Sequence, residues 1–451
     1  MAEPLIGEET GARTSASLDV RTAAWYGDRN LRLELPKSWD VSVFAPATGP
    51  PLSDVELWER LESPVDQRPI RERCSARTRP LIIVDDLNRP TPASQVLPLL
   101  VRQFTEAGIP KQNITILVGP GTHAPPTPEA VVKKVGADLI RDCRVRSHNS
   151  RQPVVNVGRT SFGTPVLVPS EVVDSDFIVG VGGVYPNYTA GFGGGAKTAL
   201  GILGFRSIAA LHFRHGIVGW GVQSANNSFR RDLGEIAKVI GLETSVLVVT
   251  DADRRIVDLA CGDVDSVHRQ VLASGTEAFR APRPDGDVRI VISNAYPGDL
   301  SLTFAQMKAM APLSKAPPSA SRIVIASCSE GLGFHGLFPF MNAPWLHGYE
   351  MLHLRLAANL NQPRRLATKA AAMAVRRIRA RLPGDLGASP RRPTWLYCPS
   401  DEALATLPAE VPGFRISSSW QEVVDGVTLE QNHDAALRTF VYTAAPLQWL
   451  G

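Results

Sequence analysis

The chain has 451 residues, 44% of them hydrophobic, and this length and composition predict a folded protein of two or three domains. Its 48 basic and 44 acidic residues leave a formal net charge of +4, a small excess that argues against a nucleic-acid or membrane partner. The five cysteines show no CxxC spacing, so a disulfide framework and a thiolate zinc site are disfavoured. With no signal-like N-terminus and no apolar run of about 18 residues, a cytoplasmic protein is predicted.

The N-terminal half reads as consecutive strand-loop-helix units, after a pair of strands expected within Ala23–Leu35. The apolar run Leu81–Val84 predicts a buried parallel strand, and the loop Asp85–Pro92 that follows it carries two carboxylates, an amide and an arginine. A second strand at Ile114–Val118 is followed by the loop Gly119–His123. Because open α/β sheets bind ligands at the carboxyl ends of their strands, the polar side chains of both loops are predicted to share one site.

The stretch Gly191–Thr198 is the most unusual of the chain, because it places four glycines in five positions and then a lysine, Lys197. It follows the strand-like run Phe177–Val184, and its glycine content predicts a loop without regular structure. Such a loop can bring backbone amides and an amine to an anionic ligand. A tight turn with a solvated lysine is the open alternative. The helix predicted beyond the loop carries His212 and His215, which are three residues apart and can share one helical face.

The C-terminal half repeats the plan of strands that end in polar loops. The Pro- and Gly-rich residues 280–286 predict a linker, a helix at Leu302–Met310 carries Lys308, and a strand at Arg322–Ala326 runs into a glycine-rich loop. We therefore predict an α/β fold of two α/β domains with the active site in the cleft between them. Residues 1–279 are expected to form the cofactor-anchoring domain and residues 287–451 the second, with its last helix packing back on the first. The Arg-rich residues 354–382 predict a solvated basic helix.

Four stretches match the motifs of one family in the same order. Asp86-Leu87-Asn88-Arg89-Pro90 resembles Asp-x-Thr-Arg-Pro, with Asn88 in place of the threonine, and Gly121-Thr122-His123 resembles Gly-Thr-His. The run from Val184 to Lys197 resembles Pro-His-x-x-Ala-Gly-(Phe/Tyr)-Ser-Gly-Gly-x-Lys, and Tyr296–Asp299 with Lys308 and Glu330–Gly333 resembles a second-domain pattern. Together these stretches, which span residues 80–335, resemble the nickel-pincer-nucleotide-dependent lactate racemase family.

The resemblance implies an isomerase that racemises or epimerises a small 2-hydroxy acid. It further implies a nickel-pincer nucleotide, made by dedicated cofactor-synthesis enzymes and covalently attached to Lys197. The other residues that the resemblance assigns to the cofactor are Gly193, Gly194, Gly195, Asp86 and Asn88. The implied nickel ligand is His212, with His215 as the alternative.

For catalysis, the resemblance implies that a hydride leaves the α-carbon while a histidine takes the hydroxyl proton. His123 matches one of the family's two catalytic histidines, Arg89 is expected to bind the substrate carboxylate and Lys308 to assist it. The second histidine falls at Asn187, whose amide cannot exchange a proton near neutral pH. The hydroxyl of Tyr188, or that of its neighbour Tyr185, is the candidate substitute.

The substitution at Asn187 leaves three functions open. The protein can epimerise a hydroxy acid with an altered second acid/base, catalyse a one-sided redox or elimination step, or bind hydroxy acids without turnover. A nucleotide-binding enzyme is a further alternative, since Gly191–Thr198 nearly matches the phosphate-binding Gly-x4-Gly-Lys-(Ser/Thr) with Ala196 in place of the second glycine. That alternative leaves the Gly-Thr-His and second-domain motifs unexplained.

Overall fold

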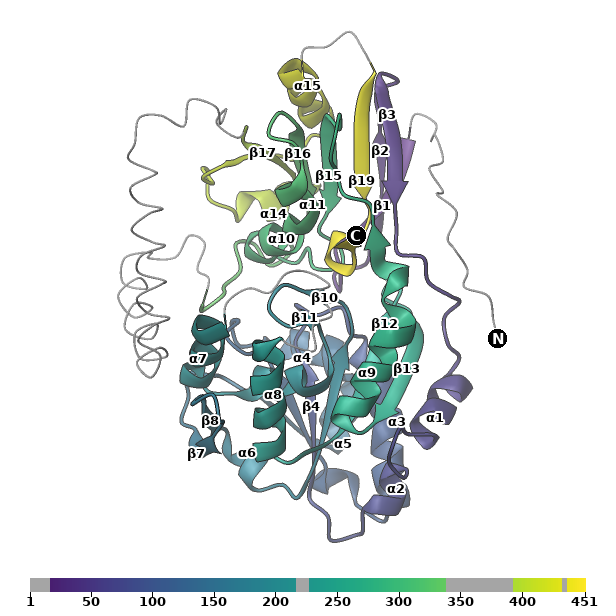
Figure 1. The fold of residues 1–451 in the computed structure, drawn as a ribbon, viewed down its shortest axis with the longest axis vertical. Helices are drawn as coiled ribbons and strands as arrows, with labels where there is room; N and C mark the ends of the chain where they lie inside the picture. The colour runs from purple at the N-terminus through teal and green to yellow at the C-terminus, as the bar shows by residue number, and fades with distance from the viewer. Residues whose placement is uncertain (1–16, 216–226, 338–391, 432–435) are drawn as a thin grey trace.

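The computed structural model describes residues 17–215, 227–337, 392–431 and 436–451. Figure 1 shows two sheets, each with its own helices, one in the lower and one in the upper half of the view. In the described part of the chain, no helix combines the length and the apolar character that crossing a membrane requires. The predicted basic helix at 354–382 lies outside the described residues.

The first sheet has the strand order β13-β12-β9-β4-β5-β6, and its strands are parallel except for the β12–β13 pair. Its strands are β4 (Pro80–Asp85), β5 (Thr115–Gly119), β6 (Arg144–Ser147), β9 (Phe177–Gly183), β12 (Leu242–Thr250) and β13 (Ile256–Gly262). The helices of this half are α1 (Asp54–Glu62), α2 (Ile70–Arg73), α3 (Ala93–Glu106), α4 (Pro128–Val135), α5 (Ala137–Asp142), α6 (Ser170–Val173), α7 (Phe205–His215), α8 (Ser228–Val239) and α9 (Val264–Gly275).

Strand β4 explains why its sequence is continuously apolar. Leu81 and Ile83 belong to one hydrophobic core, whereas Ile82 and Val84 belong to another. Successive side chains of a strand point to opposite faces, so both faces of the sheet at β4 are covered and no polar position is tolerated until the strand ends. The first polar residues, Asp85 and Asp86, therefore appear at the sheet edge that carries the site.

The second sheet is all parallel, with the order β18-β17-β16-β15-β19-β3. Its strands are β3 (Trp39–Phe44), β15 (Ile290–Asn294), β16 (Ser321–Ile325), β17 (Thr394–Tyr397), β18 (Phe414–Ser417) and β19 (Leu437–Tyr442). Its helices are α10 (Leu302–Lys308), α11 (Met310–Lys315), α14 (Asp401–Ala405) and α15 (Trp420–Gln431). Short two-stranded sheets are formed by β1 (Ser17–Thr22) with β2 (Arg29–Glu34), β7 (Val155–Arg159) with β8 (Pro165–Val168), β10 (Pro186–Asn187) with β11 (Gly191–Phe192), and β14 (Arg280–Ala281) with β20 (Trp449–Leu450).

The ends of the chain are arranged differently from the prediction, in which residues 1–279 form the first domain. Strand β3 pairs with β19 in the second sheet, and Leu18, Val20 and Leu33 of the β1–β2 hairpin join the core of that sheet. Helix α15 packs on β16, β17 and β18, so it does not fold back on the first half as expected. Strand pairing between distant segments leaves no local signal, which is why the sequence pattern missed both features.

Two local expectations are also corrected. The first strand pair is shifted, because Ala23, Trp25 and Asp28 have positive φ angles of 60°, 66° and 44° and form a connection between β1 and β2. The glycine stretch is not irregular throughout, since the 3-10 helix η2 runs over Gly195–Ile202.

The connection between β1 and β2 ties the two halves together. The Trp25 indole N–H donates to the Leu87 carbonyl at 2.9 Å, beside the first sheet, while the Tyr26 hydroxyl donates to Glu330 Oε1 at 2.9 Å, on the second half. Asp28 pairs with Arg254 and accepts a hydrogen bond of 2.7 Å from the Tyr296 hydroxyl. These contacts set the two halves against each other beside the site.

Candidate active site

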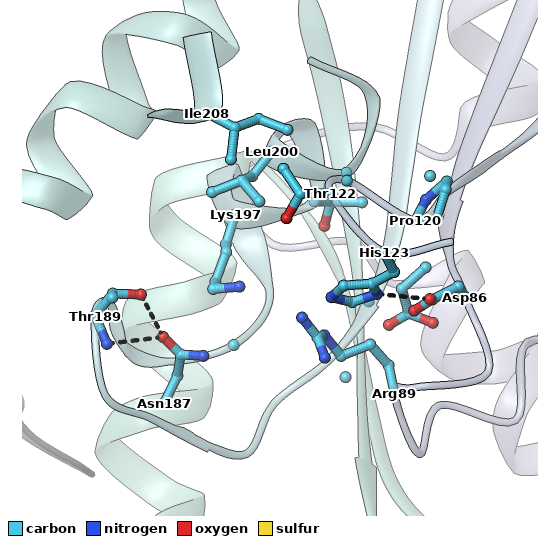
Figure 2. A pocket seen from close by; sticks show the side chains of 18 of the residues that line it. Asp86, Arg89, Pro120, Thr122, His123, Asn187, Thr189, Lys197, Leu200 and Ile208 are labelled. Atoms are coloured by element: carbon cyan, nitrogen blue, oxygen red, sulfur yellow. Dashed lines mark hydrogen bonds and ion pairs between the residues drawn. The ribbon is translucent and has the colours of Figure 1, made fainter. Parts of the chain in front are cut away.

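A pocket lies where the carboxyl ends of β4, β5 and β9 face helix α10 of the other half. Most of the residues selected from the sequence line it, namely Asp86, Arg89, His123, Asn187, Tyr188, Gly193, Gly194, Lys197, His212 and Lys308. Asn88, Gly195 and His215 are not among the lining residues. Figure 2 shows the side chains of Arg89, His123, Asn187 and Lys197 converging from different segments on one space.

Asp86 and His123 form an oriented acid/base pair. His123 Nδ1 lies 2.7 Å from Asp86 Oδ2, and both side chains are buried (Figure 2). Burial disfavours the charged imidazole and lowers the pKa of His123, although Asp86 opposes this shift. Because the carboxylate accepts the Nδ1 proton, the lone pair of the neutral ring is on Nε2. His123 is therefore a base with a fixed tautomer. Asp86, which the family resemblance had assigned to the cofactor, is the residue that orients His123.

The loop after β4 supports this pair and presents Arg89. Asn88 Nδ2 donates to Asp86 Oδ2 at 2.8 Å, so Asn88 acts on the carboxylate that orients His123. Although burial works in the opposite direction, the charges of His123 and Arg89 together with the Asn88 hydrogen bond hold the pKa of Asp86 well below its usual range. The Arg89 guanidinium points into the pocket (Figure 2), where it can bind a carboxylate through two N–H groups.

Two buried side chains that the sequence reading did not select hold the glycine stretch in place. Arg230 of α8 donates to the carbonyl oxygens of Ala190 and Gly194 at 3.3 Å each and to that of Phe192. His268 of α9 lies 2.9 Å from the Gly193 carbonyl oxygen through Nε2. Burial is the main cause that lowers the pKa of Arg230 to about 10. The carbonyls of this stretch are thus directed at α8 and α9.

Packing explains two of the glycines directly. A Cβ on Gly193 would lie 2.5 Å from the Gly183 carbonyl oxygen, and one on Gly194, whose φ is +72°, would lie 2.7 Å from Leu247. Both distances are shorter than real Cβ contacts, and the left-handed φ of Gly194 adds strain for any other residue. The glycines therefore let the stretch pack tightly under the pocket while its surface remains open to a ligand.

Lys197 has the properties of a nucleophilic amine. Its side chain reaches into the pocket (Figure 2), and burial, followed by the charges of Arg89 and Arg230, lowers its pKa to about 7. A large share of the amine is therefore neutral at neutral pH, as bond formation by lysine requires. Beside it, the buried hydroxyl of Thr198 has no hydrogen-bond partner among the described residues, so a polar ligand atom is the expected partner.

His212 and His215 have different environments on α7. His212 lines the pocket, and its Nδ1 lies 2.8 Å from the Ile208 carbonyl, which places the proton on Nδ1 and the lone pair on Nε2. Burial lowers the pKa of His212 to about 4, so the ring is neutral, as a metal ligand must be. Both ring nitrogens of His215 are engaged, at 2.9 Å with Ser228 Oγ and at 2.8 Å with Asp232 Oδ2. Of the two histidines, His212 is the one that lines the pocket.

Asn187 has a fixed amide orientation. Its Oδ1 accepts hydrogen bonds from Thr189 Oγ1 at 2.8 Å, from the Thr189 N–H at 3.1 Å and from the Ala190 N–H at 2.9 Å. Figure 2 shows the Nδ2 end directed toward Arg89 and Lys197. Burial raises the pKa of Tyr188 to about 12 and raises that of Tyr185 further, so neither hydroxyl is a base near neutral pH. At Asn187, beside the glycine stretch, the pocket therefore offers a hydrogen-bond donor and not a base.

Two substitutions separate the roles of Asn187. Asn187→Ala is expected to lower the free energy of unfolding by about 1–3 kcal/mol, because three donors lose their buried acceptor. Asn187→Asp keeps the acceptor and removes only the N–H donors, so its stability should stay closer to that of the wild type while substrate affinity falls. Urea denaturation of both variants measures the effect, and equal stability of Asn187→Ala and wild type would contradict the structural role.

Helix α10 and the segment after β16 contribute the opposite wall. Lys308 is buried, and burial, with the charges of Arg89 and Lys197, holds its pKa well below the usual value for lysine. Phe304 and Met307 of this helix also line the pocket. His335 also lines it, and no sequence motif had pointed to this residue.

The residues around His212 do not form a metal site by themselves. Within the described ranges, no cluster of three or more His, Cys, Asp or Glu side chains has the geometry to hold a metal ion. A metal at His212 would need further ligands beyond the described side chains.

Sequence comparisons find lactate racemases among the proteins that are similar to this chain. Residues 26–222 match the family described as the lactate racemase N-terminal domain. The lactate racemase of Lactiplantibacillus plantarum is 27% identical over 294 residues, which cover 64% of this chain and 69% of that protein. The lactate racemase of Thermoanaerobacterium thermosaccharolyticum is 26% identical over 325 residues, covering 69% and 76%. The chain is similar to lactate racemases, and the resemblance predicted from its motifs is confirmed.

Solved structures agree with the fold. The lactate racemase apoprotein from Thermoanaerobacterium thermosaccharolyticum matches with a TM-score of 0.69 at 19% identity, covering 96% of this chain and 100% of that chain. A Thermotoga maritima protein matches with a TM-score of 0.58 at 14% identity, covering 89% and 99%. The predicted α/β fold is confirmed, and the sequence relatives carry the name of an isomerase, in agreement with the predicted enzyme class.

Proposed function

We propose that this protein racemises or epimerises a small 2-hydroxy acid with a nickel-pincer nucleotide attached to Lys197. The observation that carries the proposal is the convergence on one pocket of an oriented base, a lysine whose pKa is lowered to about 7 and a neutral histidine of fixed tautomer, at His123, Lys197 and His212. When bound, such a cofactor accepts a hydride from the α-carbon of the substrate and returns it.

The residues present fit this group. Lys197 supplies the amine for a covalent bond, and His212 Nε2 supplies a lone pair for nickel. The Thr198 hydroxyl and the surface of the glycine stretch at Gly193 and Gly194 suit a phosphate, because buried polar groups of a site need a partner. Gly195, which is not a lining residue, begins η2 behind this surface.

Other residues that line the pocket hold and deprotonate the substrate. Arg89 binds the carboxylate as a bidentate donor, and Lys308 contributes from the second half of the molecule. His123 takes the hydroxyl proton at Nε2 while Asp86 stabilises the imidazolium that forms.

One observation favours a second candidate function. Racemisation by this route needs proton exchange on both sides of the substrate, and Asn187 presents a fixed amide where the family has a histidine. A one-sided redox or elimination reaction, or binding without turnover, needs no second base.

The phosphate-binding-loop alternative is disfavoured, because the β10–β11 pair and a 3-10 helix follow β9 here, where that motif requires a loop leading into an α-helix.

The proposal is tested with protein produced together with the cofactor-synthesis enzymes, its proposed partners in the cytoplasm. Single enantiomers of lactate and of larger and sugar-derived 2-hydroxy acids are incubated with the protein and separated by chiral chromatography. Inversion at the α-carbon of at least one acid supports the proposed function. Formation of only a 2-oxo or dehydrated product supports the second candidate, and binding without any conversion overturns both catalytic assignments.

Nickel content distinguishes the two histidines of α7. His212→Ala is expected to lower the nickel bound per protein at least tenfold, because it removes the lone pair that faces the pocket, while the bond at Lys197 is retained. His215→Gln, the matched control, should keep nickel near the wild-type level. Elemental analysis of both purified variants gives the answer, and loss of nickel only in His215→Gln would reverse the assignment.

A further inference from the structure

His335 is a buried histidine of the pocket that comes from the second half of the molecule. Its relative exposure is 7%, and it lies in the segment that follows β16, after two glycines with positive φ, Gly331 at 63° and Gly333 at 68°. A β-bridge links His335 to His123, and the Gly336 N–H donates to the Thr122 carbonyl at 2.7 Å. The backbone thus fixes His335 beside the catalytic base across the interface of the two halves.

The ring of His335 stands next to the ring of His123. Their centroids are 5.2 Å apart with an interplanar angle of 57°. Phe304 closes the group, with its ring 4.7 Å from that of His123 and 6.0 Å from that of His335. All three rings line the pocket, so a substrate oxygen that reaches His123 Nε2 also comes near His335.

The tautomers of the two histidines are complementary. The Leu337 N–H donates to His335 Nδ1 at 3.3 Å, which makes Nδ1 the acceptor and places the proton of the neutral ring on Nε2. Burial, followed by the electrostatic influence of the neighbouring basic groups His123, His212, Arg89 and Lys308, holds the pKa of His335 well below the usual value, so the neutral form dominates. His123 therefore offers a lone pair at Nε2, whereas His335 offers an N–H at Nε2.

We propose that His335 is a further catalytic residue, a neutral hydrogen-bond donor that binds the substrate oxygen from which His123 removes the proton. The proposal rests on the proposed function. As the O–H bond breaks, its proton goes to His123 Nε2 and negative charge develops on the oxygen, which the N–H of His335 stabilises without giving up its own proton. When the carbonyl oxygen becomes a hydroxyl again, the negative charge disappears and the contact with His335 weakens.

This role differs from that of a second acid/base. A neutral imidazole that gave its only N–H proton to the substrate would become an imidazolate, and the Leu337 N–H that His335 Nδ1 accepts carries no positive charge to stabilise that anion. A donor that keeps its proton has no such cost. Glutamine can supply an N–H and cannot exchange a proton, so it distinguishes the two roles.

The test compares His335→Leu and His335→Gln in protein that carries the cofactor. With the acid that the wild type converts, kcat of His335→Leu should fall about 100- to 1,000-fold, the usual effect of losing one such donor. In His335→Gln it should stay within about tenfold of the wild type. Unchanged kcat in His335→Leu, or equal inactivity of the two variants with cofactor bound, overturns the proposal.

A measurement on the cofactor-free protein is independent of turnover. Long-range proton–nitrogen correlation spectra of the imidazole rings should show His335 protonated at Nε2 and His123 protonated at Nδ1, with the His335 signals absent in His335→Gln. A proton on Nδ1 of His335 contradicts the donor role. If the wild type converts no hydroxy acid, the proposed function fails, and these spectra still decide which nitrogen of His335 carries the proton.

Discussion

Lys197→Ala is expected to yield a protein that carries no covalent adduct and has no measurable racemase activity. The reason is chemical, because the bond requires a neutral amine, and burial beside Arg89 and Arg230 lowers the pKa of Lys197 to about 7. Intact-mass measurement of the variant made together with the cofactor-synthesis enzymes shows whether the adduct is present. The same preparations are assayed for inversion of a single hydroxy acid enantiomer.

Two control variants test whether the adduct requires the nucleophilic amine of Lys197, and not merely a positive charge at this position or any lysine of the chain. Lys197→Arg keeps a cation and lacks a nucleophilic amine, so it should also lack the adduct. Lys315→Ala, at an exposed position of the second half, should keep both adduct and activity. In the wild type, the rate of attachment of purified cofactor should rise from pH 6 to about 7 and level off above it, as the amine loses its proton. An adduct of unchanged mass in Lys197→Ala would contradict the assignment.

The second large effect is expected for His123→Gln. The variant should lose about 1,000-fold in kcat, since glutamine cannot take the hydroxyl proton, while the adduct at Lys197 and the nickel content stay unchanged. Steady-state kinetics with the converted acid, together with the intact mass, measure both properties.

A matched control is His148→Gln. His148 is also buried, but its Nε2 contacts the Leu203 carbonyl at 3.0 Å and it does not line the pocket. Its replacement should leave kcat within about threefold of the wild type. If His123→Gln retained wild-type turnover, proton removal would have to be assigned to another group, and the Asp86–His123 pair would be structural.

Local motifs predicted the part of the site that each strand end contributes by itself. Asp86, Arg89, His123 and Lys197 lie directly after buried strands or within the glycine stretch, so a pattern of apolar runs followed by polar residues was enough to bring them together. The role of Asp86 was not visible in that pattern, because the contact with His123 joins two strand ends that are 37 residues apart.

Other parts of the site depend on contacts that no local pattern encodes. Arg230 reaches the glycine stretch from α8, and His335 reaches His123 from the second half of the molecule. Neither residue lies in a motif of its own, and single arginines and histidines are common on surfaces. The pairing of β3 with β19 was missed for the same reason, since the two strands stand at opposite ends of the chain.

Asn187 shows the limit of a residue-by-residue reading. The sequence indicates only that an amide replaces a histidine, whereas the structure shows that Oδ1 is occupied by three donors and that the N–H end is left for the pocket. The consequence for substrate binding follows from this orientation and not from the residue type. In the proposed site, Asn187 and His335 each supply a hydrogen-bond donor, and His123 supplies the base.

The central claim, inversion of a 2-hydroxy acid by a hydride that leaves and returns to the same carbon, is tested most directly with an α-deuterated substrate. A single enantiomer of the converted acid, deuterated at the α-carbon, is incubated in ordinary water with the cofactor-loaded wild type, and the opposite enantiomer is isolated and analysed by mass spectrometry. The account predicts inverted product that retains the deuterium. Inverted product with hydrogen from solvent at the α-carbon, or no inversion by protein that carries the adduct, would contradict it.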